Sequence, residues 1–206
     1  MKRLFVFAQA TEASATIKKL QARPVPGHLI PIWSEGIQPS LFTCDAGLIL
    51  LTSVGIHQAQ SAVAEQGGNV DEIWNLGLAG ALHDHHGIGE LLPIAQVSKY
   101  VPADLDGHAR SLMENTLPSL MLEKEGKTLI SSDFPIHDIG HRDRARPSDL
   151  VDMEGYGVAF AAHHLGKKCR MWKIVSDFAT PGGVALIRKH KQELSEKMAQ
   201  FLCKQL

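Results

Sequence analysis

The chain has 206 residues, of which 44% are apolar and 21% are charged, and its net charge at pH 7 is −1. This composition is typical of a globular protein with a sizeable core, so we expect one domain over residues 1–206. The near-neutral charge offers no basic surface, which excludes nucleic acid and an anionic membrane from the expected partners.

The cysteines and the N-terminus indicate a cytoplasmic protein. Cys44, Cys169 and Cys203 show no motif spacing and are expected to be free thiols in a reducing compartment. The first apolar stretch is too short for a signal peptide, and Glu12 follows it closely. No apolar stretch approaches the length of a transmembrane helix.

Apolar periodicity predicts strands that alternate with helices. Strands are expected at residues 4–8, 30–33, 48–54, 71–76, 93–101, 127–131 and 171–175. Helices are expected at residues 13–20, 57–66, 108–122 (broken at Pro118), after Glu154, and at 183–204, whose apolar stripe is expected to pack on the core; residues 132–150 are expected to form a polar loop. Several strands are continuously apolar, which favours an α/β fold with a central, largely parallel sheet between two helical layers.

The segment 151–177 contains two carboxylates at positions where α/β proteins bind ligands. Glu154 lies where a strand or loop turns into a helix, and Asp177 follows Ser176 at the end of an apolar strand. Ligands of open α/β sheets bind outside the carboxyl ends of the strands, so both carboxylates could face one crevice. Both carboxylates also have an ordinary structural explanation, because Asp177 and Glu154 could each cap a helix. A third acidic residue, Glu12, could simply lie on the surface.

Two other motifs allow simpler interpretations. Residues 77–80 (GLAG) are expected to form either a tight turn or a segment whose backbone approaches a ligand closely. They match neither a Walker loop nor a dinucleotide-binding fingerprint. Residues 83–86 (HDHH) suggest a metal, yet no Cys or Glu accompanies them at ligand spacing, so a solvated loop is expected. We therefore expect no metal and no cofactor.

Taken together, the chain resembles the purine nucleoside phosphorylase and methylthioadenosine/S-adenosylhomocysteine nucleosidase superfamily. The Met-Glu helix start combined with the later Ser-Asp is its most specific feature. The matching segments keep the family's order and are residues 4–12 (LFVFAQATE), 53–59 (SVGIHQA), 75–82 (NLGLAGAL), 88–90, 132–134, 151–159 (VDMEGYGVA) and 173–177 (KIVSD). The resemblance implies a curled, mixed sheet flanked by helices and cleavage of a nucleoside N-glycosidic bond.

The resemblance also implies roles for individual residues. Asp177 would be the acid that serves the purine N7, held by Ser176. Glu154 would bind the ribose hydroxyls with Met153 beneath the sugar, and Glu12 would activate the attacking water. Phe134 would stack on the base, and Ile56, Ala79 and Gly80 would line the pocket.

One departure from the family pattern selects the nucleophile. Phosphorylases carry an arginine just before the glycine of this turn, whereas the chain has Asn75 and Leu76 there. A phosphate dianion would be poorly bound without such cations, so water is the expected nucleophile. The expected substrate is futalosine or aminodeoxyfutalosine, intermediates of menaquinone biosynthesis. Alternatives are methylthioadenosine and S-adenosylhomocysteine, a phosphorylase, or a non-catalytic nucleoside-binding protein; the family implies a homodimer.

Overall fold

The computed structural model describes residues 1–32, 36–102 and 105–206. Its main sheet has ten strands, and a separate hairpin is formed by β3 (Leu29–Ile32) and β4 (Gly36–Pro39). The strands of the main sheet are β1 (Arg3–Phe7), β2 (Arg23–Pro24), β5 (Leu41–Cys44), β6 (Gly47–Leu51), β7 (Glu72–Ala81), β8 (Leu91–Lys99), β9 (Leu120–Met121), β10 (Lys127–Ser131), β11 (Leu150–Asp152) and β12 (Lys168–Asp177). The helices are α1 (Ala10–Lys19), α2 (Ile56–Gln66), α3 (Gly107–Thr116), α4 (Ile139–Ala145), α5 (Gly155–His164) and α6 (Gly183–Gln205).

The sheet is mixed and closes partly on itself. Its order is β11-β10-β8-β12-β7-β1-β6-β5-β2, and β11 pairs with β7 as well as with β10. Strands β6, β1, β7 and β12 run parallel, whereas β8 lies antiparallel to β12 and β11 antiparallel to β7. Strands β7, β12, β8, β10 and β11 therefore form a ring, which confirms the curled, mixed sheet that the resemblance implies.

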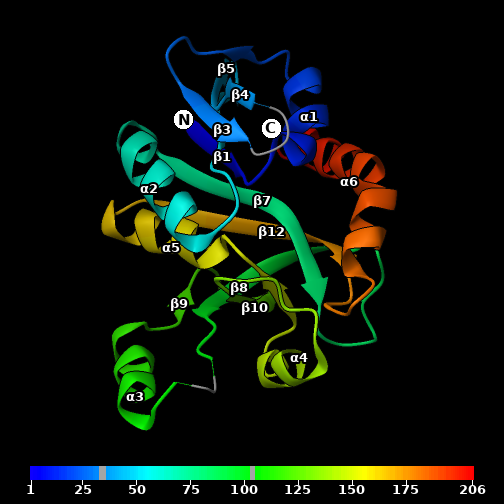
Figure 1. Ribbon diagram of the computed structural model, residues 1–206. Coiled ribbons are helices and arrows are strands. Elements are labelled where there is room, and N and C mark those ends of the chain that lie inside the picture. Colours follow the sequence, from blue (N-terminus) through cyan, green and yellow to red (C-terminus); the bar gives the residue numbers. More distant parts are fainter. Residues whose placement is uncertain (33–35, 103–104) are drawn as a thin grey trace.

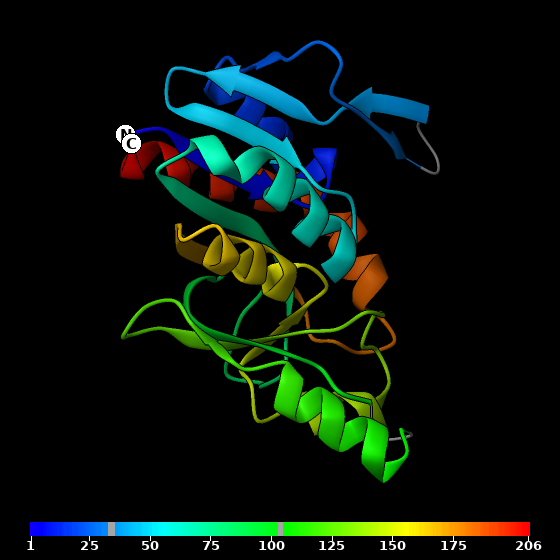
Figure 2. The ribbon, with the colours of Figure 1, turned by 90° about the vertical axis from the view of Figure 1, so that its left-hand side faces the viewer.

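Helices cover both faces of the parallel part of the sheet. Helices α2 and α5 pack together on one face, and α1 and α6 on the other (Figures 1 and 2). Alternate residues of β1 serve the two layers: Leu4 and Val6 belong to the core beneath α2 and α5, and Phe5 and Phe7 to the core beneath α1 and α6. The predicted three-layer α/β fold is confirmed.

Several details differ from the predictions. Residues 132–150 contain helix α4, which lacks an apolar stripe. Its N-cap residue is Asp138, whose side chain accepts a hydrogen bond from His141 N at 2.9 Å. The predicted helix at 108–122 ends at Thr116, and β9 follows Pro118. Residues 77–80 continue strand β7 rather than forming a turn. Of the predicted strand at 30–33, Trp33 lies outside the described residues.

Three sequence expectations concern single features. Leu194, Met198 and Leu202 of α6 are buried in the core, whereas Ile187 of the same stripe lines a cavity. The three cysteines are free thiols. None of the helices in the described part of the chain is long and apolar enough to span a bilayer.

The parallel arrangement places several functional candidates at one edge of the sheet. Strands β1, β7 and β12 are parallel, so their carboxyl ends lie together. Helix α1 follows β1 after a short connection and carries Glu12 in its first turn. Helix α5 follows β11, whose Val151 pairs with Gly80 near the end of β7. The fold therefore brings Glu12, Glu154 and Asp177 to one edge.

Candidate active site

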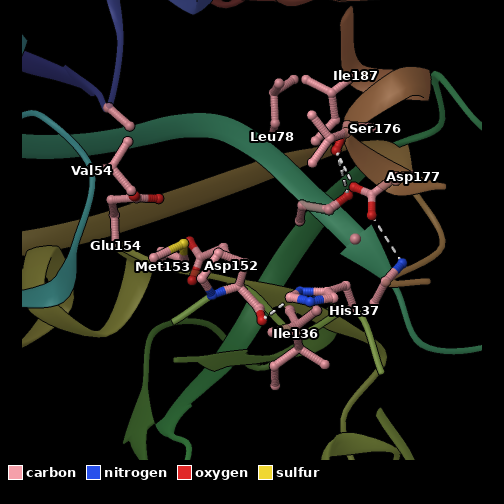
Figure 3. A pocket seen from close by; sticks show the side chains of 18 of the residues that line it. Val54, Leu78, Ile136, His137, Asp152, Met153, Glu154, Ser176, Asp177 and Ile187 are labelled. Atoms are coloured by element: carbon pink, nitrogen blue, oxygen red, sulfur yellow. Dashed lines mark hydrogen bonds between the residues drawn. The ribbon is translucent and has the colours of Figure 1, made fainter. Parts of the chain in front are cut away.

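A cavity of about 240 Å³ opens at this edge of the sheet (Figure 3). Seven of the residues predicted for the site line it: Glu12, Ala79, Gly80, Met153, Glu154, Ser176 and Asp177. Glu154 and Asp177 lie on opposite sides of the cavity (Figure 3). A larger groove of about 740 Å³ between α1 and α6 is lined by surface lysines, glutamines and small residues rather than by these carboxylates.

Glu12 projects a carboxylate from the first turn of α1 towards the sheet. Its main-chain oxygen accepts a hydrogen bond from Ser195 Oγ at 2.8 Å, which fixes α1 to α6. Its Oε2 atom is buried and has no hydrogen-bond partner among the described residues. Burial raises the pKa of Glu12 to about 8; the charge of Glu154 adds to the rise, and Lys173 opposes it.

Glu154 is the N-cap residue of α5 and is buried. Its Oε1 atom accepts a hydrogen bond from Gly55 N at 3.0 Å, so α5 is joined to the loop before α2. Burial raises the pKa of Glu154 to about 7; the charge of Asp152 adds to the rise, whereas Lys173 and the Gly55 N–H lower it. Glu154 and Glu12 both titrate near neutrality for the same physical reason, which is loss of water around the charge.

A buried ion pair supports these two carboxylates, and the sequence analysis missed it. Lys173, in the middle of β12, is 1% exposed, and its Nζ atom lies 2.8 Å from Asp152 Oδ2. Asp152 also accepts hydrogen bonds from Gly155 N, at 2.9 Å, and from Ser131 Oγ. Burial opposes the charge of Lys173, but the surrounding carboxylates raise its pKa above the ordinary value.

Gly77 leaves space beside β7 for the charged ends of Lys173 and Glu12. A Cβ atom at Gly77 would lie 3.2 Å from both Glu12 Oε2 and Lys173 Nζ. A side chain at this position would therefore press on both charged groups at once. The absence of a Cβ at Gly77 thus leaves space for two charged side chains, rather than for the close approach of backbone N–H groups to a ligand that the sequence suggested.

The cluster of Glu12, Asp152, Glu154 and Lys173 holds three carboxylates and one cation. Full ionisation would leave a net charge of −2 in a buried volume, which is unfavourable. The raised pKa values of Glu12 and Glu154 show how the protein relieves this charge, because one of the two takes up a proton near neutral pH. A carboxylate with a pKa near the working pH is suited to general-base catalysis.

Asp177 is held quite differently, by hydrogen-bond donors rather than by a cation. Ser176 Oγ donates to Asp177 Oδ1 at 2.7 Å, and Ala179 N donates to Asp177 Oδ2 at 2.9 Å. Gly183 packs directly on the carboxylate, since a Cβ atom there would lie 2.6 Å from Oδ2. Both oxygens of Asp177 are therefore fixed in position at the cavity wall.

Two residues beside the cavity adopt left-handed backbone conformations without being glycine. Ser53 has φ of 67° and precedes the lining residue Val54, and Ala179 has φ of 51° and supplies a hydrogen bond to Asp177. Such conformations are uncommon for residues with a Cβ atom and concentrate at functional sites. They flank Glu154 and Asp177 respectively, so strained backbone lies next to both functional sides of the cavity.

Two predicted site residues do not line the cavity. Ile56, the first residue of α2, is buried in the core between the sheet, α2 and α5. The ring of Phe134 packs edge-to-face with Tyr100 and His141, at centroid distances of 5.8 and 5.0 Å. The neighbouring Ile136 lines the cavity instead. Other lining residues, which the sequence did not predict for the pocket, include Leu78, Ile136, His137 and Ile187.

Comparison with known proteins places this architecture in a family. No curated protein matches the chain at a significant level. Among solved structures, the Streptococcus pneumoniae methylthioadenosine/S-adenosylhomocysteine nucleosidase with 8-aminoadenine matches with a TM-score of 0.75 at 18% identity, covering 98% of this chain and 97% of that one. The native futalosine hydrolase of Helicobacter pylori matches with a TM-score of 0.71 at 16% identity, covering 98% of this chain and 95% of that one. The model of the phosphorylase superfamily matches residues 41–206, more than half of the chain, and the protein therefore belongs to the phosphorylase superfamily.

Proposed function

We propose that this protein is a nucleoside N-ribosyl hydrolase that cleaves the N-glycosidic bond of a purine-type nucleoside with water as nucleophile. One observation favours water over phosphate as the nucleophile. Four carboxylates line the cavity, whereas none of its described lining residues is lysine or arginine. The nearby cation, Lys173, is already paired with Asp152. A phosphate dianion would meet uncompensated negative charge in this site.

Asp177 protonates the leaving purine. A purine anion leaves poorly until a proton reaches N7, and Asp177 presents a fixed carboxyl group at the cavity wall for that proton. Ser176 Oγ and Ala179 N hold its two oxygens, which restricts the side chain to one orientation. As the C1′–N9 bond breaks, the bonding electrons move to the base, and the N7 proton keeps the leaving group neutral.

Glu154 and Met153 bind the ribose. Glu154 lies across the cavity from Asp177 and accepts ribose hydroxyl hydrogen bonds, while Met153 packs beneath the sugar. Bond cleavage develops oxocarbenium-like positive charge on the ribose, which nearby carboxylates stabilise. Ala79 and Gly80 leave room for the nucleoside because their side chains are small or absent. Stacking of Phe134 on the base requires its ring to leave the contact with His141.

Glu12 activates the water. Its Oε2 atom lacks a partner among the described residues and lies in the cluster with Lys173 and Glu154. With its pKa raised by burial to about 8, the Glu12 carboxylate is a stronger base than an exposed glutamate. It takes one proton from water as the hydroxyl oxygen forms a bond to C1′, which yields free ribose-type product and base.

We propose futalosine or 6-amino-6-deoxyfutalosine as the preferred substrate. Residues 10–12 (ATE) and 78–81 (LAGA) resemble futalosine hydrolases more than methylthioadenosine nucleosidases. Solved structures named for both activities share this fold, so methylthioadenosine and S-adenosylhomocysteine are the alternative substrates. The predicted homodimer and cytoplasmic location stay predictions.

The test is to incubate the purified protein with each of the four nucleosides, with and without phosphate, and to identify the released products. The proposal expects free base and free ribose-type product in phosphate-free buffer. Base release that requires phosphate and yields a ribose 1-phosphate would identify a phosphorylase. Tight nucleoside binding without release of any base would identify a binding protein.

A further inference from the structure

The histidine-rich segment between β7 and β8 is more ordered than its sequence suggests. His86 is 4% exposed, although its neighbours Asp84 and His85 are exposed. Asp149, just before β11, lies beside it, and Leu82 N donates to the main-chain oxygen of Asp149 at 3.0 Å. The expectation of a solvated loop is therefore wrong for His86.

One ring nitrogen of His86 is fixed by a carboxylate. His86 Nδ1 lies 3.0 Å from Glu90 Oε2, and Gly87 N donates to the same oxygen at 3.1 Å. An ionised carboxylate only accepts hydrogen bonds, so Nδ1 carries the proton. In the neutral ring, Nε2 then presents a lone pair. Glu90 therefore acts as a hydrogen-bond partner of His86 and is not itself among the candidate ligand atoms.

The second ring nitrogen of His86 faces negative charge without a hydrogen-bond partner. His86 Nε2 is buried, has no partner among the described residues, and lies 3.7 Å from Asp149 Oδ1. Asp149 is itself held in place, because its Oδ2 accepts hydrogen bonds from Thr128 N at 2.8 Å and Thr128 Oγ1 at 2.9 Å. A lone pair opposite a carboxylate oxygen is repulsive unless a metal cation lies between them or Nε2 itself carries a proton.

A third donor completes the cluster. The His85 ring lies 4.2 Å from that of His86 between centroids, and one ligand atom each from His85, His86 and Asp149 fall within 4.8 Å of one another. His85 is exposed, and its ring stacks on that of His83 at a centroid distance of 5.5 Å, whereas His86 and Asp149 are fixed by hydrogen bonds. Lys127 Nζ, 3.6 Å from Asp149 Oδ1, is the cation that shares this carboxylate.

We propose that His85, His86 and Asp149 bind a divalent transition-metal ion such as Zn²⁺. Two imidazole nitrogens and one carboxylate oxygen are a donor set that zinc prefers, with metal–ligand distances of about 2.0–2.2 Å and a fourth position for water. The Glu90 carboxylate on Nδ1 is the outer partner that metal-binding histidines commonly have, and it fixes the tautomer that leaves Nε2 free. A modest turn of the His85 ring brings the third donor into range.

The position of this site indicates a structural role next to the catalytic cavity. The ion joins the β7–β8 loop to the residue that precedes β11, the strand that contains Asp152. The same loop is tied to β12, because Gly89 N donates to Val175 O at 2.8 Å and Val175 N donates to Glu90 O at 2.9 Å. Val175 directly precedes Ser176 and Asp177. Binding of the ion therefore connects the loop to β11 and β12, two strands whose ends line the cavity.

The experiment measures metal binding and stability rather than activity. We use the full chain with Cys203→Ser, which removes the exposed thiol as a competing ligand, after metal removal with a chelator. Zn²⁺ titration by calorimetry should show one site, Co²⁺ should give the visible absorption of a four-coordinate complex, and added Zn²⁺ should raise Tm. His85→Ala should weaken Zn²⁺ binding at least tenfold and abolish the rise in Tm.

His83→Ala is the matched control, because this histidine supplies no ligand atom to the cluster, although its ring stacks on that of His85. It should bind Zn²⁺ as the parent does. Asp149→Asn gives a second loss of affinity through a different ligand. Equal binding by the parent, His83→Ala and His85→Ala would overturn the proposal, as would the absence of any Zn²⁺ effect on Tm. The latter result would show instead that a proton on His86 balances Glu90 and Asp149.

Discussion

The two sides of the cavity contain buried carboxylates whose charge is stabilised by different means. Glu12 and Glu154 share one ammonium group, that of Lys173, with Asp152, and burial raises the pKa of both glutamates towards neutrality. Asp177 has no cation beside it and is held by the Ser176 hydroxyl and the Ala179 N–H. Shared charge produces a group that exchanges protons near pH 7, whereas fixed dipoles produce a group of fixed orientation. The first property suits a base for water, and the second suits the delivery of a proton to one atom of the leaving base.

The largest expected effect comes from removing the shared cation. Lys173→Met leaves three carboxylates in a buried cluster without a counterion, and we expect a loss of about 3–5 kcal/mol in the free energy of unfolding. Urea denaturation at pH 7 measures it. Lys168→Met is the matched control on the same strand, because the Lys168 side chain is 46% exposed and forms a surface ion pair with Glu123. Its effect should stay within about 1 kcal/mol. Lys173→Met combined with Asp152→Asn should recover part of the loss, and no recovery would contradict a charge-based explanation.

On the other side of the cavity, Asp177→Asn removes the proton donor but keeps the shape of the side chain. Turnover of the nucleoside substrate should fall by about 10²–10⁴, while nucleoside binding and Tm stay close to the parent values. Steady-state kinetics and calorimetry on the same preparation provide the measurement. Near-parental turnover would show that Asp177 is not the acid.

Glu12→Gln tests the base on the shared-charge side. The variant should bind substrate about as tightly as the parent, and its turnover should fall by about 10²–10⁴, because water is positioned but not deprotonated. Single-turnover kinetics together with binding measurements separate the two steps. If Glu12 has no part in the reaction, the turnover numbers of variant and parent will agree.

The same variant should also change how the stability of the protein depends on pH. The pKa of Glu12 is raised from 4.5 to about 8 by folding, so the folded state binds its proton more tightly than the unfolded state. The associated stability is present below about pH 4.5 and is lost as pH rises to about 8. The free energy of unfolding of Glu12→Gln relative to the parent should therefore increase with pH, by at most about 1.4 kcal/mol per pH unit, and level off above pH 8. A difference that is constant from pH 5 to pH 9 would contradict the raised pKa.

Ser176→Ala should give the smallest effect. It removes a hydroxyl that donates to Asp177 Oδ1 at 2.7 Å but leaves the donor from Ala179 N in place. We expect kcat/KM to fall about tenfold, equivalent to about 1.4 kcal/mol, with little change in Tm. A loss as large as that of Asp177→Asn would show that Ser176 takes part in proton transfer itself.

The sequence predicted those parts of the fold and site that depend on local pattern. Continuous apolar runs identified β1, β6, β7 and β12, and the order of these elements placed Glu12, Glu154 and Asp177 at one sheet edge. Helix α4 was missed because it lacks an apolar stripe, although Asp138 at its start is a typical cap.

The charged cluster could not be read from the sequence for a different reason. Lys173 lies between Trp172 and Ile174, so it can be taken for the solvent-facing residue of a half-buried strand. Strand β12 is covered on both faces, and a lysine within such a strand needs a buried partner. Asp152 lies 21 residues earlier, and only the pairing of β7 with both β11 and β12 brings the two together.

That double pairing of β7 also has a consequence for the order in which the protein folds. Gly80 of β7 pairs with Val151 of β11, and Glu72 of β7 pairs with Lys168 of β12. Closing the ring therefore joins residues about 70 to 100 positions apart in the sequence. Contacts between such distant residues require large loops to close first, which slows folding. The cavity cannot form until β11 and β12 have both docked on β7. We therefore expect nucleoside binding to appear only in the slowest phase of refolding.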